Sequence, residues 1–222
     1  MTNNNEQLKK TSKQTLNNSC LKRLFDIIFS LIALILLSPV FVVLSVWIII
    51  DDGFPVFYKQ ERSGIHNSIF RLYKFRSMKN KQVPVESNTH EYTDWTDGVP
   101  DDFVFKTASE ENPNITRVGR FIRRYSLDEL PQFINVLKGD MSLIGPRPEI
   151  LAISKHYNKH QQNRLLVLPG ITGWAQVNGR SHMNHGKKIE LDLYYVQHAN
   201  LLLDIKILFK TIYQAILGKE SV

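Results

Sequence analysis

The chain has 222 residues, which is enough for one globular domain and an additional segment. Hydrophobic residues make up 43% and charged residues 22%, which excludes a largely disordered chain, and the one cysteine excludes an internal disulfide. The formal net charge of +7 predicts an anionic partner, whether nucleic acid, an acidic membrane surface or a phosphorylated substrate.

The amino-terminal part divides into a polar leader and an apolar run. Residues 1–19 are rich in Asn, Thr, Gln and Lys, which predicts a disordered leader. Residues 24–50 are apolar except for a single charge, Asp26, and are long enough for a helix to cross a bilayer core. The run is too long and too far from the N-terminus for a signal peptide.

Ser38 and Pro39 interrupt the apolar run near its middle. Proline removes a backbone donor and clashes with the preceding turn, so a helix kinks there, and Ser38 can bind a backbone group freed at the bend. Lys22 and Arg23 ahead of the run favour a cytoplasmic N-terminus. A kinked helix that crosses the membrane and a helix that re-enters and leaves on one face both fit this pattern.

Strand and helix patterns follow. Residues 69–78 alternate apolar and basic side chains, which predicts a half-buried strand with Arg71, Lys74 and Arg76 pointing outwards. Residues 171–180 are predicted to be extended or loop. Helical patterns cover 116–125, 127–138 (ending at Gly139), 155–168, 187–198 and 201–217.

Two of these helices have informative faces. In 116–125 the apolar positions alternate with arginines, which suits an anionic membrane surface or phosphate. In 201–217 one apolar stripe serves either the core or a membrane interface. The apolar positions are Val118, Phe121, Ile122 and Tyr125 in the first helix, and Leu201, Ile205, Leu208, Ile212 and Ile216 in the second.

Adjacent carboxylates, Asp128 and Glu129, follow the arginine-rich helix. Ser126 and Glu129 fit a Ser-x-x-Glu capping box, which satisfies the free amides of a helix start. A carboxylate at a helix start, held ionised by nearby arginines, can also attack phosphorus and form an acyl-phosphate. The residues alone leave both interpretations open.

Chemistry on a phosphorylated substrate also needs positive charge. Arg123, Arg147 and Arg180 are candidates to bind phosphate, because the planar guanidinium group fits phosphate oxygens. A divalent ion would neutralise a diphosphate, and Mg²⁺ with carboxylate ligands is the usual choice.

Several long motifs, in order, resemble the bacterial sugar transferases of the monotopic phosphoglycosyl transferase superfamily. The resemblance covers residues 20–218 and includes the run Ser-Leu-Asp-Glu-Leu-Pro-Gln around the paired carboxylates. The matching segments are 22–26, 38–39, 73–78, 126–132, 135–142, 145–148, 169–180, 190–196 and 203–207.

The resemblance implies an activity and a fold. The family transfers a phospho-sugar from a UDP-sugar to undecaprenyl phosphate and releases UMP, which starts lipid-linked glycan assembly. The implied fold is α/β, mostly helical with few short strands and with interfacial amphipathic helices. A membrane helix at 20–50, kinked at Ser38 and Pro39, re-enters the bacterial inner membrane, and one catalytic domain at 51–222 lies on the cytoplasmic face.

The resemblance also assigns roles to residues. Asp128 is the nucleophile that takes the phospho-sugar and contacts Mg²⁺, and Glu129 acts as a base or orients the acceptor. The positions assigned to phosphate or nucleotide binding are Lys74, Arg123, Arg147, Thr172, Gln176 and Arg180.

The resemblance is incomplete before the basic helix. Asn112, Pro113 and Asn114 stand where family members commonly carry an acidic residue and an arginine. Residues 79–113 are polar and longer than in the shortest members, and they are predicted to be a surface loop with a short helix at 86–92. The alternative is that this stretch shapes the sugar pocket.

The expected partners are a UDP-sugar, undecaprenyl phosphate and membrane lipid, and the sequence is compatible with a homo-oligomer. No nucleic-acid partner is expected, because no reading motif or base-stacking pattern is present. The rival interpretation is a basic, membrane-tethered binding or scaffold module without catalysis. The sequence does not identify the sugar.

Overall fold

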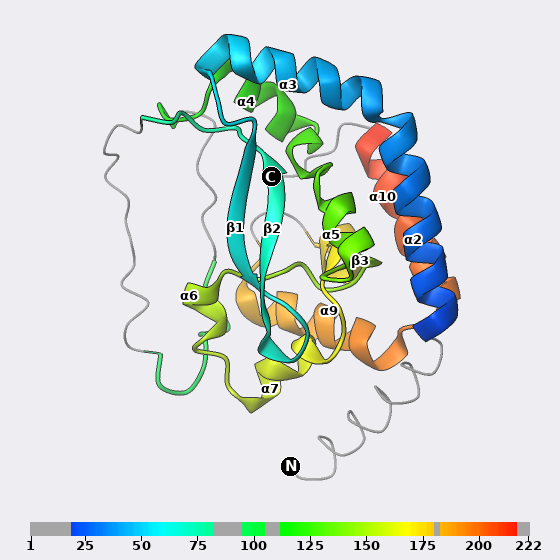
Figure 1. Ribbon diagram of the computed structural model, residues 1–222. Coiled ribbons are helices and arrows are strands. Elements are labelled where there is room, and N and C mark those ends of the chain that lie inside the picture. Colours follow the sequence, from blue (N-terminus) through cyan, green and yellow to red (C-terminus); the bar gives the residue numbers. More distant parts are fainter. Residues whose placement is uncertain (1–18, 82–94, 105–111, 180–182, 217–222) are drawn as a thin grey trace.

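Helices dominate the structure, and the strands are few and short, as the sequence predicts (Figure 1). The computed structural model describes residues 19–81, 95–104, 112–179 and 183–216. Nearly all of the predicted leader, the short helix predicted at 86–92 and the site residue Arg180 lie outside these ranges. Two separate two-stranded sheets occur in the described part of the chain.

The apolar amino-terminal run forms two helices, α2 (Ser19–Leu36) and α3 (Ser38–Asp52), bent by 59° at their junction. The bend confirms the predicted kink. Pro39 stands in the first turn of α3, where its missing amide costs no helical bond, and Ser38 Oγ donates to the Ile35 carbonyl (2.7 Å). Among the described helices none alone is long and apolar enough to cross a membrane, whereas this bent pair meets both criteria together.

The polar side chains of α2 bind the rest of the protein. Arg23 donates to the last carbonyls of helix α5 (Gln132–Lys138), with 2.6 Å to Val136 and 3.0 Å to Leu137. A cation at a helix C-terminus satisfies free carbonyls and complements the helix dipole. Arg23, which the sequence suggested as a topology signal, therefore also caps a helix of the domain.

Two further contacts attach α2 to the carboxyl-terminal half. Lys22 forms an ion pair with Asp204 of α10 (2.7 Å), and the hydroxyl of Tyr195 donates to the same carboxylate (2.7 Å). Asp26, the one charge in the apolar run, is buried and accepts the amide of Leu143 (3.1 Å). A buried carboxylate needs such partners.

Strands β1 (Phe57–Ser63) and β2 (Ile69–Phe75) form an antiparallel hairpin. The predicted strand is confirmed, but two of its outward assignments are wrong. Lys74 lies two residues from buried Leu72 and so shares its face. Arg76 follows the end of β2 and is 6% exposed, where it donates to the carbonyls of Asp52 and Gly53 (2.9 and 2.7 Å).

The basic helix α4 (Arg117–Arg124) begins at Thr116, whose side chain accepts the Gly119 amide (2.8 Å). Its predicted apolar stripe is divided in two. Val118 and Ile122 are buried against α3 and β2, whereas Phe121 and Tyr125 are exposed.

The helix predicted at 127–138 is shorter than expected. Residues Leu127–Glu129 form a 3-10 turn, η2, and α5 begins only at Gln132, after Pro131. Gly139 ends α5 in the left-handed conformation with φ 91°, which confirms the predicted stop.

The carboxyl-terminal half departs from two predictions. The helix predicted at 155–168 is replaced by α6 (Leu151–Ser154), α7 (Lys159–Gln162) and the 3-10 turn η3 (Asn163–Leu166). The stretch predicted as extended contains helix α8 (Trp174–Asn178), preceded by strand β4 (Gly170–Thr172). Strand β4 pairs in parallel with β3 (Ser142–Ile144).

The last two helices, α9 (His185–His198) and α10 (Leu201–Ile216), match the predictions closely. The inner face of α10 differs from the predicted stripe, because Asp204 and Ile207 are the buried positions. Its outer face exposes large apolar side chains: Leu202, Phe209, Ile212 and Tyr213.

The described part of the 79–113 stretch is packed against the domain. Val99 is 2% exposed, and its amide and carbonyl both bind the side chain of Gln161 (3.0 and 2.6 Å). It joins an apolar cluster with Tyr157 and Leu193. Residues 95–104 otherwise consist of turns without a helix or strand, and Asp101 and Asp102 are exposed, so the predicted surface loop is confirmed here, with Val99 as its buried contact.

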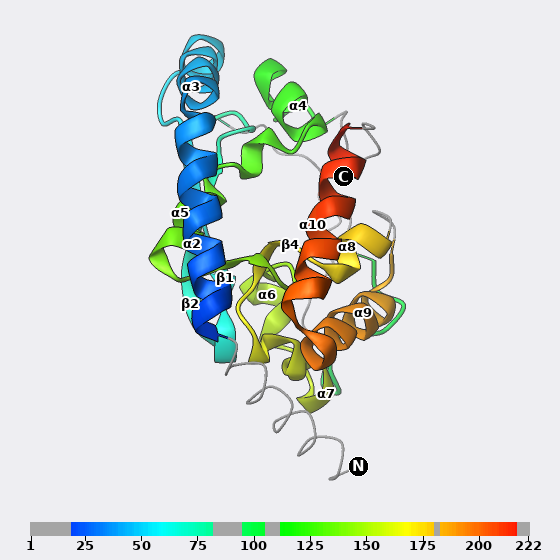
Figure 2. The same ribbon diagram turned by 90° about the vertical axis from the view of Figure 1, so that its right-hand side faces the viewer.

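The elements are arranged between two ends. Helices α3 and α4 lie at one end of the molecule and α7 at the other, with α2 and α10 along the sides between them (Figures 1 and 2). Large apolar side chains are exposed along much of α2 and α3, which is unusual for a surface in water.

Candidate active site

The paired carboxylates lie in the η2 turn between α4 and α5. Ser126, just before the turn, adopts a left-handed conformation with φ 53° and makes no side-chain capping bond to it. The predicted capping box is therefore wrong, and the Glu129 side chain is directed elsewhere. A non-glycine residue in this conformation is uncommon and clusters at functional sites. Asp128 is 9% exposed.

Lys74 reaches this turn because β2 is fixed against α5. Asn135, fully buried in α5, accepts the amide of Tyr73 (2.9 Å) and donates to the carbonyl of Arg71 (2.7 Å). These two bonds satisfy backbone groups of the strand on either side of Leu72. They fix the register that brings Lys74 Nζ to 2.8 Å from Glu129 Oε1 and 3.6 Å from Asp128 Oδ2.

Arg147 approaches the same carboxylate from the turn after β3. Its Nη1 donates to Glu129 Oε2 (3.1 Å), and its Nη2 binds Oε1. This paired geometry is the strong arrangement for arginine and carboxylate. The turn is held by backbone bonds to β4, since the Gly145 amide donates to the Thr172 carbonyl and the Gly170 amide to the Pro146 carbonyl (both 2.9 Å).

The two carboxylates have opposite electrostatic environments. Burial raises the pKa of Asp128 above its ordinary value, and the neighbouring charge of Glu129 adds to this rise, against the lowering effect of Lys74. Burial also acts to raise the pKa of Glu129, but Arg147 and Lys74 outweigh it and hold that pKa far below its usual range. Glu129 is thus a fixed anion, whereas Asp128 has no such close pairing with a cation.

Arg123 is the third predicted cation that the structure places near the pair. Its charge lowers the pKa of Asp128, although less than that of Lys74. Within the described part of the chain, its Nη1 is buried and has no hydrogen-bond partner. Such a donor is costly to leave unpaired, so it is available to an anionic ligand.

Thr172 and Gln176 are held by other contacts. The hydroxyl of Thr172 lies 2.7 Å from that of Thr211 in α10, and Gln176 Nε2 donates to the carbonyl of Ile171 (3.0 Å). Gln176 Oε1 is buried without a partner in the described residues. The structure thus brings Lys74, Arg123 and Arg147 to the carboxylates. Thr172 and Gln176 instead contact residues of α10 and β4.

A metal ion at this site would depend on Asp128. Among the described residues, no three His, Cys, Asp or Glu side chains gather to form a cage. Mg²⁺ does not need one, because it is commonly held by one or two carboxylates together with substrate phosphates and water. The Asp128 carboxylate fits that donor set in its ionised form, and a bound cation would oppose the burial and the Glu129 charge that raise its pKa.

A buried ion network, which no local sequence pattern predicts, supports the Arg147 turn. Arg164 is 1% exposed, donates to the carbonyl of Arg147 (2.8 Å) and pairs with Asp192 (2.7 Å). It also donates to the hydroxyl of Tyr157 (2.7 Å), which in turn donates to Glu149 (3.1 Å).

Lys188 completes this network by pairing with Glu149 (2.6 Å). Burial acts to raise the pKa of Glu149, but Lys188 and Arg164 lower it well below the ordinary value. Because each buried charge has a partner of opposite sign, the network can persist in the interior.

Comparison with known proteins covers most of the chain. Residues 17–218 match the family described as "Bacterial sugar transferase". The uncharacterized sugar transferase EpsL of Bacillus subtilis is 40% identical over 199 residues, which cover 90% of this chain and 89% of that protein.

Two longer relatives have more specific names. The UDP-glucose:undecaprenyl-phosphate glucose-1-phosphate transferase of Escherichia coli is 37% identical over 92% of this chain. The undecaprenyl-phosphate galactose phosphotransferase of Salmonella typhimurium is 42% identical over 86% of it. The matches cover only 42% and 39% of these two proteins. The family match over residues 17–218 and the similarity to EpsL along nearly its whole length establish that the chain belongs to the bacterial sugar transferase family.

Proposed function

We propose that this protein transfers a sugar-1-phosphate from a UDP-sugar to undecaprenyl phosphate and releases UMP. The observation that carries the proposal is the asymmetric carboxylate pair, in which Glu129 is neutralised by Lys74 and Arg147 while the nearest cation to buried Asp128 is 3.6 Å away. The names of the longer relatives supply the substrate classes. The product would begin a lipid-linked glycan.

Asp128 is proposed as the nucleophile. One of its carboxylate oxygens bonds to the sugar-bearing phosphorus while the bond from that phosphorus to the UMP oxygen breaks, which leaves an aspartyl phospho-sugar. An oxygen of undecaprenyl phosphate then attacks the same phosphorus and displaces the carboxylate. Bound Mg²⁺ would supply positive charge against the diphosphate.

The surrounding cations are proposed to hold the substrate phosphates. Arg123 offers a buried guanidinium nitrogen without a partner in the described residues, and Arg147 is 45% exposed at the edge of the site. Guanidinium groups in a partly dry site stabilise negative charge on the transferring phosphoryl group. Thr172, Gln176 and Arg180 are proposed, from the family resemblance alone, to contact the nucleotide.

Glu129 is proposed to position these cations. Its pKa is held far below the ordinary value by Arg147 and Lys74, so it is a poor proton acceptor at neutral pH. Of the two roles that the family resemblance implies, orientation of the acceptor fits this environment better than base catalysis, and Glu129 would act through the two cations that it holds.

The bent helix pair is proposed to enter and leave the bacterial inner membrane on its cytoplasmic face. The leader at 1–19 would precede it, and the catalytic domain at 51–222 would rest on the membrane. The exposed apolar side chains of α2, α3, α4 and α10 support such a surface. Phe121 of α4, with its ring 5.3 Å from that of Trp47, continues the apolar surface of α3.

The test is an assay of UMP release. Purified full-length protein is incubated with undecaprenyl phosphate, Mg²⁺ and each of a panel of UDP-sugars that includes UDP-glucose and UDP-galactose. We expect UMP from at least one donor, and a lipid-linked phospho-sugar in equal amount. Absence of UMP with every donor would favour the non-catalytic membrane-tethered module.

The acid limb of the pH profile is expected to depend on Lys74. Lys74 lowers the pKa of Asp128, so Lys74→Gln should raise that pKa further. Because the attacking carboxylate must be ionised, the first-turnover rate of UMP release should then require a higher pH. The measurement is the rate against pH for the wild type, for Lys74→Gln and for Lys155→Gln, an exposed lysine on the far side of the domain. An unchanged acid limb in Lys74→Gln would contradict the proposal that the ionised Asp128 beside Lys74 is the attacking group.

A further inference from the structure

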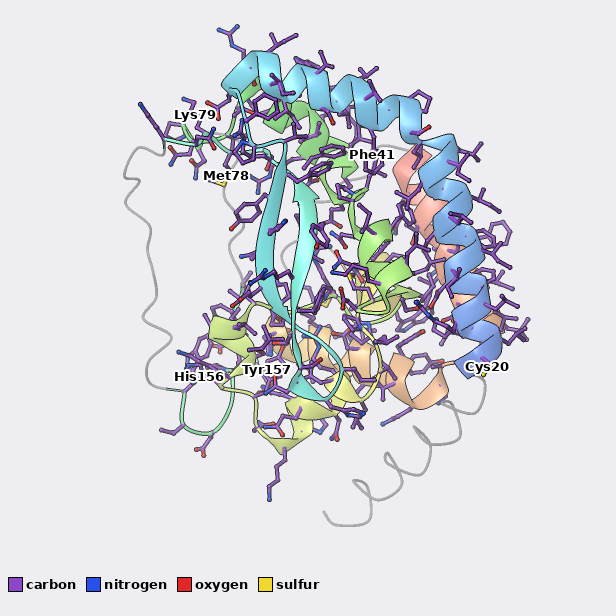
Figure 3. The ribbon with its side chains drawn as sticks, viewed as in Figure 1. Cys20, Phe41, Met78, Lys79, His156 and Tyr157 are labelled. Atoms are coloured by element: carbon purple, nitrogen blue, oxygen red, sulfur yellow. The ribbon has the colours of Figure 1, made fainter. Side chains whose placement is uncertain are left out.

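An open groove of about 710 Å³ lies where the end of α3, the residues after β2 and the start of α4 meet. Neither Asp128 nor Glu129 lines it. Figure 3 shows Lys79 at this end of the molecule, close to the end of α3 and far from His156 and Tyr157. The lining of the groove therefore does not include the proposed catalytic pair.

One side of the groove is cationic. Lys79, Arg117 and Arg120 line it, and all three are exposed. Among the described residues, none of the three forms an ion pair within 4 Å of a carboxylate. Three unpaired cations around one hollow give a local positive potential that attracts an anion.

The two carboxylates that also line the groove are bound elsewhere. Asp52 pairs with buried Arg76 (3.2 Å) and accepts the amide of Asn80 (2.9 Å). Asp51 accepts the amide of Val118 (3.0 Å). Their charges reduce the positive potential of the groove. Their carboxylate oxygens, however, bind Arg76 and backbone amides and form no ion pair with the three exposed cations.

The other side of the groove is apolar. Trp47, Ile50 and Ile115 line it, and Trp47 and Ile50 are 41% and 78% exposed. The same face of α3 exposes Val43 and Val46 beyond the groove. A cationic hollow at the border of a broad apolar surface matches an amphiphile that carries an anionic head and apolar tails.

We propose that this groove binds the head group of an anionic membrane phospholipid. Lys79, Arg117 and Arg120 surround its phosphate, and its acyl chains lie along the exposed face of α3. A bound lipid would hold the end of the bent helix pair at the membrane surface. The proposal goes beyond catalysis and rests on the proposed membrane attachment.

The test measures lipid retention by native mass spectrometry. Full-length protein is reconstituted in nanodiscs of phosphatidylcholine with a minor fraction of phosphatidylglycerol, then released into the gas phase. We expect the wild type to retain phosphatidylglycerol in preference to phosphatidylcholine. In Arg117→Gln/Arg120→Gln that preference should fall about tenfold or more, because each cation near an anionic lipid contributes to binding.

Matched variants separate this effect from net charge and from folding. Lys155→Gln/Lys159→Gln removes the same charge at the opposite end of the molecule and should retain lipid as the wild type does. Lys79→Gln alone should weaken retention even if the double variant folds poorly. Excess glycerol 3-phosphate should not displace the lipid, because it lacks the apolar tails.

Three outcomes would overturn the proposal. The first is that the wild type retains both lipids equally, and the second is that the two groove variants retain phosphatidylglycerol as fully as the wild type. The third is that undecaprenyl phosphate displaces phosphatidylglycerol, which would make the groove a site for the acceptor substrate. UMP release measured on the same samples distinguishes the two proposals. Protein that retains phosphatidylglycerol but releases no UMP refutes the catalytic proposal and leaves the lipid site supported.

Discussion

Replacing Asp128 with Asn is expected to lower UMP release by about a thousandfold or more, because the attacking carboxylate oxygen is lost while the shape of the side chain is kept. The measurement is single-turnover UMP release with the preferred donor. Asp102→Asn, at an exposed position in the packed part of the 79–113 stretch, is the control and should react as the wild type does. Undiminished release from Asp128→Asn would exclude the nucleophile assignment.

The same substitution is expected to stabilise the fold. Burial raises the pKa of Asp128 in the folded protein, so keeping it ionised at neutral pH costs folding free energy. Asparagine removes that cost, and Asp128→Asn should therefore unfold at a higher temperature than the wild type at pH 7. The difference should shrink as the pH approaches about 4, where the carboxyl also protonates in the unfolded chain. A lower unfolding temperature at pH 7 would contradict the electrostatic description of the site.

Arg164→Met is expected to cause the largest loss of stability, about 3–5 kcal/mol, because it leaves Asp192 as an uncompensated buried charge. Thermal unfolding in detergent would measure it. The double variant Arg164→Met/Asp192→Leu should recover much of the loss, since an apolar pair can replace a buried ion pair.

Lys187→Met provides the matched control. Lys187 forms an ion pair of similar length with Glu190 (2.8 Å), but both side chains are more than half exposed. Exposed pairs contribute about 0–1 kcal/mol, so this variant should change little. Equal losses at the two sites would show that burial is not what makes Arg164 important.

The candidate site was predictable to the extent that its residues are neighbours in the chain. The run around Asp128 and Glu129 identified the carboxylates, and the turn around Arg147 identified a cation. The inward position of Lys74 follows from the two-residue period of a strand, which places it on the face of Leu72, whereas its basic character alone predicts an outward position.

The supporting contacts of Asn135 and Arg164 are not predictable from the sequence. Asn135 binds β2 backbone groups 62 and 64 positions away, and Arg164 binds Asp192 28 positions away. No local pattern reports such pairs. The bend at Ser38 and Pro39 was predictable, because proline acts on its own preceding turn.

The contacts of α2 have a consequence for how the chain can be divided. The apolar helix pair differs in composition from the chain that follows it, but Arg23 donates to the carbonyls at the end of α5 and Lys22 pairs with Asp204 of α10. Deleting the first fifty residues would remove the cations from the end of α5 and from Asp204, and would also remove Phe25 from the apolar cluster that contains Val136 and Leu143. Helix α2 is thus one wall of the folded protein, and α2 and α10, which lie far apart in the sequence, must meet before this side of the interior is closed.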